Sequence, residues 1–201
     1  YQEVKELDIG IVVNNVGISQ ANVLGKFEDK LIKETIIVNC LSQALITNKF
    51  ISAMSTRHSR SAIIDISSLS GITPSNFLPV YASTKAFNKF LSIGMNLNGR
   101  YPNIDFQCLA PGFISTAMIN NVQKNILVSS ADECANGSLR CLGHVNYCYG
   151  SIKSVIHGIF LELVYLIFPP KIAVKVSAIP FLLSMPKDLF TKKPDTKQKS
   201  N

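Results

Sequence analysis

The feature that most constrains the fold is an alternation of short β-branched runs with longer segments of helical periodicity. Leu7–Val13 has the character of a buried parallel strand, and similar runs follow at Ala62–Ile66 and Ile104–Leu109. Between these runs, apolar residues recur at helical spacing over Glu28–Met54 and Val80–Asn98. Strands that alternate with helices form a parallel sheet through right-handed crossovers. The sequence therefore predicts an α/β fold, a partial Rossmann-like doubly wound parallel sheet.

Length and composition indicate a folded protein. The chain has 201 residues, of which 47% are hydrophobic and 16% charged, so it can bury a sizeable core and is not disordered. Its five cysteines are an odd number and form no CxxC pair, which argues against a disulfide framework and against a structural zinc site. We expect no metal site. The first residue is Tyr1, and no signal peptide follows it, which suggests that processing or truncation removed the true start.

The chain changes character after residue 150. We expect a catalytic domain over 1–150, an apolar helical segment over 151–186 and a basic tail over 187–201. Ile159–Phe168 and Ile172–Leu183 are strongly apolar, but each is shorter than the roughly 20 residues that a spanning helix needs. Broken by Pro169-Pro170, they fit a helical hairpin in a membrane interface or a flap over a substrate. The alternative is a pair of core or dimer-interface helices.

The formal charge is +7, and much of the basic excess lies in the C-terminal tail. A basic tail that follows apolar segments suits an anionic membrane surface. No stacking-aromatic pattern or zinc spacing accompanies it, so we expect no nucleic-acid partner.

One constellation of residues carries chemistry. Tyr81 and Lys85 are four residues apart on a predicted helix, so the ammonium can favour the ionised form of the phenol. Ser68 lies in the turn after a predicted strand, at the carboxyl edge of the sheet where ligands bind in open α/β folds. Taken singly, each has an ordinary explanation: a surface helix for the Tyr–Lys pair, and a turn serine that caps its own backbone for Ser68.

Four blocks together make the chain resemble a short-chain dehydrogenase/reductase, and they occur in the order and spacing of that family. The blocks are Asn14-Asn15-Val16-Gly17, Ile66-Ser67-Ser68 through Gly71, Tyr81-Ala82-Ser83-Thr84-Lys85, and Pro111-Gly112-Phe113-Ile114-Ser115-Thr116.

The resemblance implies a role for each matched residue. Tyr81 is the general acid/base, Lys85 lowers the pKa of Tyr81 and holds the nicotinamide ribose, and Ser68 positions the substrate carbonyl. Asn39 completes a water-mediated proton relay to Lys85; its ordinary alternative is a polar residue tolerated in a helix. The remaining implied cofactor contacts are Asn15 and Gly17 on the adenosine side and Ile114 and Thr116 at the nicotinamide amide, while Asn14 steadies the sheet.

A narrower resemblance is carried by Val13–Ser19, Ala131–Gly143, Tyr149-Gly150 and the apolar C-terminal region. These segments are similar to the very-long-chain 3-oxoacyl-CoA reductases and to the 17β-hydroxysteroid dehydrogenases of types 3 and 12. The resemblance implies an NADPH-dependent enzyme of the endoplasmic reticulum membrane that acts on a long-chain acyl-CoA or a steroid. Lys197 and Lys199 stand where a dilysine retrieval signal would place them, or belong to a solvated basic tail.

The chain departs from the family pattern in one respect. It has no GxxxGxG turn, whose backbone N–H groups would hold the cofactor's pyrophosphate at a helix N-terminus. We expect that the native gene encodes a further N-terminal portion. The alternative is an inactive fragment that serves as a membrane-bound partner or scaffold. The resemblance also implies a homodimer, formed through the Val80–Asn98 helix and its preceding neighbour.

Overall fold

The computed structural model describes residues 3, 4, 6–20, 24–75, 77–97, 99–119 and 121–184, with the backbone alone for 180–184. A parallel sheet forms its centre, with strand order β1-β2-β3-β6. The strands are β1 (Ile11–Asn14), β2 (Ser61–Ile66), β3 (Ile104–Leu109) and β6 (Tyr147–Cys148). The predicted α/β fold with a doubly wound parallel sheet is confirmed.

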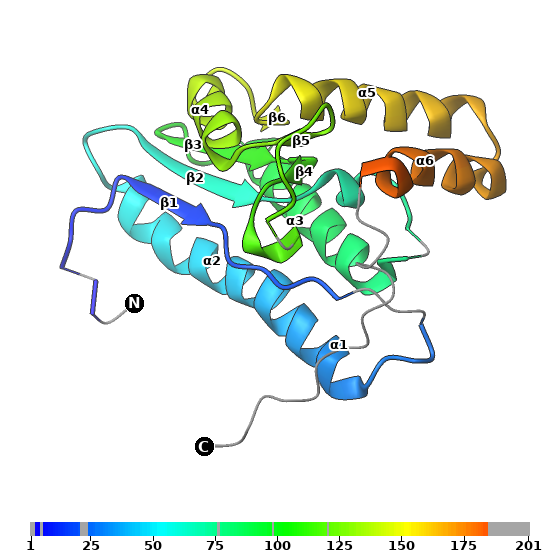
Figure 1. Ribbon diagram of the computed structural model, residues 1–201. Helices are drawn as coiled ribbons and strands as arrows, with labels where there is room; N and C mark the ends of the chain where they lie inside the picture. The colour runs from blue at the N-terminus through cyan, green and yellow to red at the C-terminus, as the bar shows by residue number, and fades with distance from the viewer. Residues whose placement is uncertain are drawn as a thin grey trace.

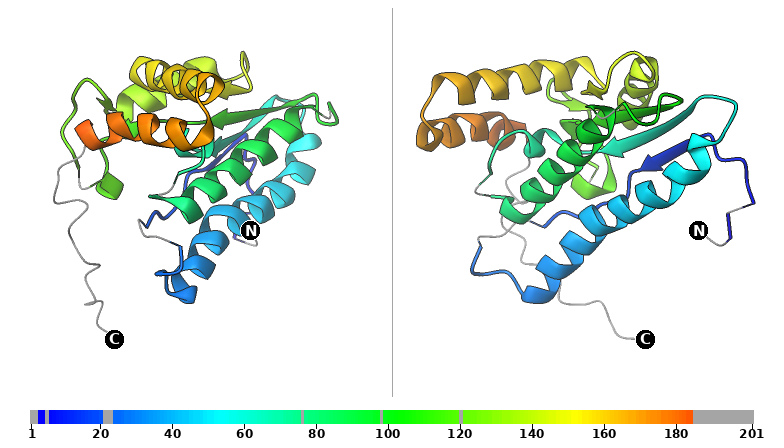
Figure 2. Two further views of the ribbon diagram at one scale, coloured as in Figure 1. Left: turned by 90° about the vertical axis from the view of Figure 1, so that its right-hand side faces the viewer. Right: turned by 180° about the vertical axis from the view of Figure 1, so that it is seen from behind.

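Helices cover both faces of this sheet. Figure 1 shows α2 and α3 on one side of the strands and α4 and α5 on the other. The helices are α1 (Asp29–Ile36), α2 (Ser42–Ser55), α3 (Pro79–Leu97), α4 (Ala131–Cys141), α5 (Ile152–Ile167) and α6 (Pro170–Ser184). A π-helical turn, η1 (Ile37–Leu41), joins α1 to α2, so that the three form the long continuous rod visible in Figure 2.

Two apolar clusters hold the layers together. One packs Ile51 and Met54 of α2 against Ile63 and Phe106 of the sheet. The other lies on the opposite face, where Cys134 of α4 packs with strand residues that include Ile64 and Leu109. Alternate residues of a strand point to opposite faces, so β2 supplies both clusters from neighbouring positions.

The first strand is shorter than its apolar run. The run predicted a strand over Leu7–Val13, but the paired strand is Ile11–Asn14. Its ladder begins where β2 begins: the carbonyl of Gly10 accepts from Ala62 N at 2.9 Å, and pairing runs from there to Asn14 and Asp65. The partner strand therefore sets the start of the pairing.

Several predicted elements match closely. The predicted strand Ile104–Leu109 is β3, and the predicted helix Val80–Asn98 is α3, displaced by one residue at each end. The capping box at the start of α4 is present: Ser130 Oγ accepts from Glu133 N at 3.1 Å, and Ser130 N donates to Glu133 Oε2 at 3.0 Å. Side-chain and backbone signals agree at these places.

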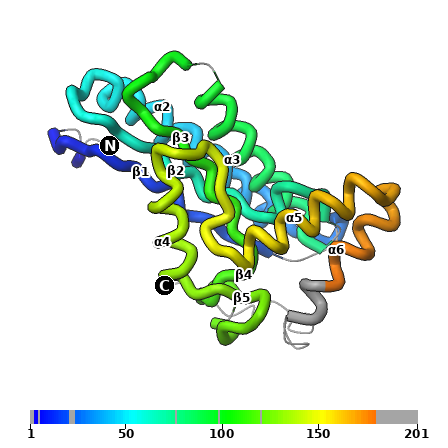
Figure 3. The backbone as a smooth tube through the Cα atoms, turned by 90° about the horizontal axis from the view of Figure 1, so that it is seen from above, coloured from blue at the N-terminus to red at the C-terminus, as the bar shows by residue number. Residues whose placement is uncertain are grey.

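The apolar C-terminal runs form two helices. Figure 3 shows α5 and α6 side by side, extending beyond the sheet, and they separate at the proline pair 169–170. The helix α5 begins at Ile152, well before the apolar run at Ile159, because Ser151 caps it by accepting from Ser154 N at 3.2 Å. The basic tail, with Lys197 and Lys199, lies outside the described residues.

Three two-residue strands were not predicted from the sequence. They are β6 at the sheet edge and the pair β4 (Phe113–Ile114) and β5 (Val128–Ser129), which form a small second sheet. Strands of this length carry no periodicity, so no sequence pattern marks them.

Candidate active site

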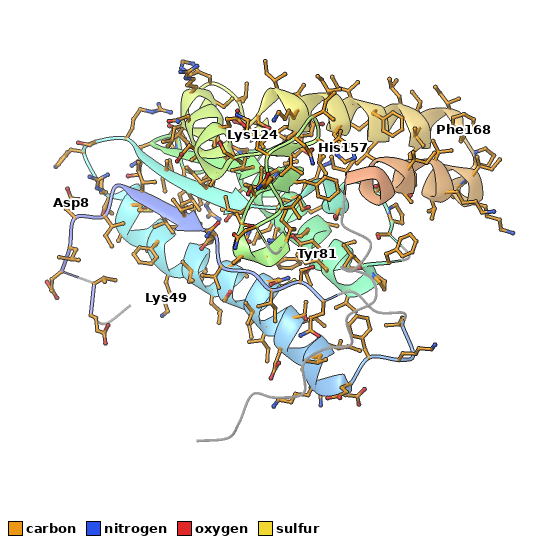
Figure 4. The ribbon with its side chains drawn as sticks, viewed as in Figure 1. Asp8, Lys49, Tyr81, Lys124, His157 and Phe168 are labelled. Carbon is orange, nitrogen blue, oxygen red and sulfur yellow. The ribbon has the colours of Figure 1, made fainter. Side chains whose placement is uncertain are left out.

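The predicted catalytic residues meet at the carboxyl edge of the sheet. Ser68 follows β2, Tyr81 and Lys85 lie in the first turns of α3, and Asn39 lies in the π-helical turn before α2. Figure 4 labels Tyr81 on α3, near the ends toward which β1 and β2 point. Ligands bind at this edge in open α/β sheets.

Lys85 is deeply buried, with 3% of its surface exposed. Its Nζ donates to the carbonyl of Ile66 at 2.8 Å and lies 5.7 Å from the centre of the Tyr81 ring. Burial lowers the pKa of Lys85 to about 8, because a charged ammonium loses hydration there. The ammonium of Lys85 is thus close to its titration point and lies beside the phenol ring of Tyr81.

The turn that carries Ser68 is clamped onto α3. Ser67 Oγ donates to the carbonyl of Lys85 at 2.7 Å. At Gly71 a Cβ would lie 2.6 Å from the Lys85 carbonyl carbon, so only glycine lets the turn approach this closely. The clamp fixes the distance between the serine turn and the Tyr–Lys helix.

Tyr81 is half-buried and interacts with Ser68. Burial raises the pKa of the Tyr81 phenol, and a hydrogen bond with the Ser68 hydroxyl lowers it in part. The phenol is therefore protonated at neutral pH and available as a proton donor. Ser68 Oγ also accepts from Ser70 N at 3.1 Å, so the turn-capping role that we weighed as its ordinary explanation exists beside the contact with Tyr81.

Asn39 is buried and fully engaged. Its Nδ2 donates to Thr84 Oγ1 at 3.0 Å and to the carbonyl of Ile18 at 2.9 Å, and its Oδ1 accepts from Ile18 N at 2.9 Å. The amide thereby ties the strand-exit segment to α3, one residue before Lys85. Its part in a water-mediated relay stays a prediction.

Gly17 lies over this group. A Cβ at this position would lie 3.3 Å from Lys85 Nζ and 3.4 Å from Asn39 Oδ1. A side chain at this position would press on the ammonium and on the Asn39 amide, so glycine permits this close packing. The ammonium beside this glycine is a donor of the kind that ribose hydroxyls of a nicotinamide cofactor can accept from.

The other predicted cofactor residues flank the edge. Asn15 is exposed after β1, while Ile114 and Thr116 are half-buried after β3. Thr116 Oγ1 donates to the carbonyl of Ile114 at 3.2 Å. Asn14 steadies the sheet as expected, since its Nδ2 donates to Asp65 Oδ1 at 2.7 Å and to a threonine of α2.

Sequence reasoning missed two supporting residues. Thr84 links Asn39 to the catalytic helix, and Asp65 is a buried acid one residue before the strand end that carries the Lys85 acceptor. Thr84 lies inside the Tyr–Lys block, where its position between the two residues could have marked it. The polar Asp65 within the apolar run Ala62–Ile66 was the signal for the other.

These features agree with a comparison against known families. The sequence model of the short chain dehydrogenase family matches residues 2–127. The chain belongs to the short-chain dehydrogenase family. That assignment places it among oxidoreductases, and the Ser–Tyr–Lys geometry lies within the matched stretch.

Short-chain dehydrogenases with known names provide closer comparisons. The very-long-chain 3-oxoacyl-CoA reductase of Rattus norvegicus is 32% identical over 162 residues, covering 75% of this chain and 52% of the relative. The 17-beta-hydroxysteroid dehydrogenase type 3 of Danio rerio is 29% identical over 161 residues, covering 78% of this chain and 52% of the relative. The chain thus spans about half the length of these relatives, and the predicted subgroup is confirmed.

Solved short-chain dehydrogenase structures share the fold. The bulky-bulky ketone specific alcohol dehydrogenase from Comamonas testosteroni superposes with a TM-score of 0.59 at 25% identity, over 68% of this chain and 52% of that one. A 7beta-hydroxysteroid dehydrogenase gives a TM-score of 0.76 at 14% identity, over 87% of this chain and 69% of that one.

Within the described part of this chain, no group of three or more His, Cys, Asp or Glu side chains is arranged to hold a metal ion.

Proposed function

We propose that the full-length protein reduces a 3-oxoacyl-CoA to the 3-hydroxyacyl-CoA with NADPH, as a step of very-long-chain fatty acid elongation. The observation that carries the proposal is the buried Lys85 beside the Tyr81 ring, with the Ser68 hydroxyl near enough to lower the pKa of the same phenol. The similarity to the rat very-long-chain 3-oxoacyl-CoA reductase supports the substrate class.

The residues divide the proton chemistry among themselves. Tyr81 donates its proton to the developing alkoxide of the substrate, and Ser68 donates a hydrogen bond to the same oxygen. The ammonium of Lys85 stabilises the tyrosinate that remains, because an adjacent cation favours the charged form of a phenol. When bound, the nicotinamide cofactor supplies the hydride. Tyr81 and Lys85 would hold its nicotinamide ribose, Asn15 and Gly17 its adenosine side, and Ile114 and Thr116 its amide.

Asn39 has a supporting role in this proposal. The side chain of Asn39 is occupied by its contacts with Ile18 and Thr84, so the backbone of Asn39, in the π-helical turn, is the part proposed to hold a water. A water held there would pass a proton from solvent to Lys85, which returns Tyr81 to its protonated form. The sequence contains no Gly-rich turn of the kind that holds a pyrophosphate, so no residue is assigned to that part of the cofactor.

A steroid is the second candidate substrate. The similarity to the zebrafish 17-beta-hydroxysteroid dehydrogenase type 3 favours it. The proton chemistry at Tyr81 is the same for both carbonyls, so the site itself does not separate them.

Purified full-length protein should be assayed with NADPH and either a long-chain 3-oxoacyl-CoA or a 17-ketosteroid. We expect turnover of the 3-oxoacyl-CoA at the higher kcat/KM. Preference for the ketosteroid would replace the acyl-CoA proposal with the steroid one. Failure to bind NADPH and to turn over either substrate would instead support an inactive partner or scaffold.

Membrane association is proposed for residues 151–186, followed by the basic tail 187–201. The outward side of α5 exposes a series of apolar side chains, namely Ile152, Ile156, Ile159, Leu163 and Leu166. The exposed Lys171 and Lys175 on α6 add positive charge beside them. Within the described residues, the one helix with the length and composition to cross a membrane is Asp29–Ser55, a property that core helices share. Interfacial binding by α5 and α6 would suit any anionic membrane; we propose the endoplasmic reticulum membrane because of the similarity to the very-long-chain 3-oxoacyl-CoA reductases.

The membrane proposal has a direct test. Vesicles that contain anionic lipid should bind the protein, and a Leu163→Asp/Leu166→Asp variant should bind them far more weakly. Equal binding by the two proteins would contradict a role for α5.

A homodimer is proposed through the outer sides of the π-helical turn, α2 and α3. Exposed apolar side chains gather there, including Leu41, Leu45, Phe87 and Phe90. Light scattering should give the mass of a dimer, and Phe90→Asp should reduce it to that of a monomer. A wild-type monomer would refute the proposal.

A further inference from the structure

The loop that follows β3 is supported from behind by α5. This loop, residues 111–116, contains the proposed nicotinamide contacts Ile114 and Thr116. The backbone N–H of Gly112 donates to Ser154 Oγ at 3.0 Å. Ser154 is on the buried side of α5, with 2% of its surface exposed. A helix far along the chain therefore satisfies a backbone donor of the candidate cofactor loop.

Ser154 Oγ is itself held by a chain of hydroxyl groups. Ser151 Oγ donates to Ser154 Oγ at 2.9 Å, and the hydroxyls of Ser151 and Ser129 are 2.8 Å apart. Ser129 belongs to β5, which pairs with β4 inside the loop region. The serine chain thus joins the start of α5, the small second sheet and Gly112.

Packing around Gly112 leaves little freedom for this contact. A Cβ on Gly112 would lie 3.1 Å from Leu69 Cδ1 and 3.3 Å from Ser154 Oγ. One helical turn further along α5, the buried His157 ring lies 5.6 Å from the Phe113 ring, between centroids. Figure 4 labels His157 on the side of α5 that faces the body of the protein. The loop is therefore packed against α5 at two consecutive residues.

This support comes from residues after the stretch that the family model matches. The match ends at residue 127, whereas Ser151, Ser154 and His157 come later. Apolar side chains cover much of the outward side of α5, whereas Ser154 and His157 face the loop. Burying a hydroxyl group costs free energy unless it is hydrogen-bonded. The contacts of these hydroxyl groups with the loop therefore offset the cost of burying them.

We infer that Ser154 is a positioning residue that fixes the 111–116 loop, and with it Ile114 and Thr116, for the nicotinamide end of the cofactor. The cofactor part of this inference rests on the proposed function, whereas the positioning of Gly112 does not. The serine of the helix cap is Ser151, which accepts from Ser154 N at 3.2 Å, so a change in the Ser154 side chain leaves the cap of α5 in place.

Amide hydrogen exchange tests the positioning directly, without cofactor. In Ser154→Ala, exchange at Gly112 and its neighbours should become roughly three- to ten-fold faster, the effect of one lost hydrogen bond. The control is Ser55→Ala, which removes a serine hydroxyl bonded within α2 and far from the loop. Unchanged exchange over 111–116 would overturn the inference. Uniformly faster exchange across the chain would do so too, because it indicates general destabilisation.

Cofactor binding tests the consequence in the full-length protein. The Kd for NADPH should rise about ten-fold in Ser154→Ala and stay at the wild-type value in Ser55→Ala, the factor that corresponds to one well-placed hydrogen bond. The KM for NADPH should rise more than kcat falls, since the loop orients the cofactor and does not transfer the proton. A wild-type protein that binds NADPH, with an equal Kd for Ser154→Ala, would overturn the cofactor part. A wild-type protein that binds no NADPH would defeat the proposed function, while the exchange result would still decide the positioning of Gly112.

Discussion

Two neighbouring rows of side chains cross the same face of the sheet and differ in chemistry. The apolar row consists of Val12, Ile63 and Phe106, which are paired across the three strands. The polar row lies two residues further along each strand and consists of Asn14 and Asp65, with the Cys108 thiol as their neighbour on β3. The helices that cover the rows follow the same division. Ile51 and Met54 lie over the apolar row, whereas Thr47 accepts a hydrogen bond from Asn14 in the polar row.

The difference separates stability from function within about 7 Å, the rise of two strand residues. Burial of the apolar row contributes favourable free energy. Burial of the polar row costs free energy unless each group finds a partner, and Asp65 Oδ2 is an atom for which the described residues provide no hydrogen bond. The polar row adjoins the turn that carries Ser68 and the Ile66 carbonyl bound by Lys85. A change at the functional end should therefore lower kcat without lowering stability. A change in the apolar row should lower stability and leave kcat unchanged.

Tyr81→Phe should give the largest change at the functional end. Loss of the phenolic proton donor should lower kcat by roughly 10²- to 10⁴-fold, the range of general acid catalysis. Stability should stay near the wild-type value, because the ring and its packing remain. Steady-state kinetics and thermal melting of the full-length protein would measure both. Retention of more than a tenth of wild-type kcat would contradict the assignment of Tyr81 as the proton donor.

Ile63→Ala should give the converse result at the stable end. Ile63 is fully buried between the strands and α2, so its truncation should lower the free energy of unfolding by about 2–5 kcal/mol. The kcat per folded molecule should be unchanged. Urea denaturation measures the first quantity and active-site titration corrects the second. A loss of kcat comparable to that of Tyr81→Phe would show that the rows are not separable.

The same division explains what could be predicted from the sequence. Periodic segments such as β3 and α3 were recognisable because burial repeats along them, and the site residues were recognisable from their order and spacing. The partners of those residues were not. The bond from Lys85 to the Ile66 carbonyl, and the contacts of Asn39 with Ile18 and Thr84, depend on how separate segments pack. The link from Gly112 to Ser154 joins residues 42 positions apart, and no local pattern encodes it.

Lys85→Met should remove function and increase stability. Burial lowers the pKa of Lys85 to about 8 from 10.5, which corresponds to roughly 3 kcal/mol against the charged form. The lost bond to the Ile66 carbonyl offsets about 1 kcal/mol of that gain. The net gain near pH 7 should raise the Tm by several degrees.

The pH dependence of this gain has a defined sign. Between pH 8 and about 10.5 the unfolded chain binds more protons than the folded one at this lysine, so wild-type stability rises with pH. The advantage of Lys85→Met should therefore be complete below pH 8 and shrink as the pH approaches 10.5. A variant that is less stable than wild type at pH 7 would show that the buried ammonium contributes more through its contacts than it costs in hydration.

Asp65→Asn should give the smallest change. As with Lys85, the variant removes a buried charge, here that of an acid. Burial raises the pKa of Asp65, although the hydrogen bond from Asn14 opposes the shift. The stability that this carboxyl contributes to the fold is complete below its unfolded pKa of about 3.8. It is lost as the pH rises through the higher pKa of the folded state. An asparagine keeps an oxygen that can accept from Asn14 Nδ2 and carries no charge. The variant should thus be more stable than wild type at pH 7 and equal to it near pH 4, as measured by melting at both values. Asp65→Ala is the matched control, because it leaves Asn14 without this acceptor and should be less stable at both. A gain for Asp65→Asn that is the same at pH 4 and pH 7 would mean that better packing, and not the removed charge, relieves the polar row.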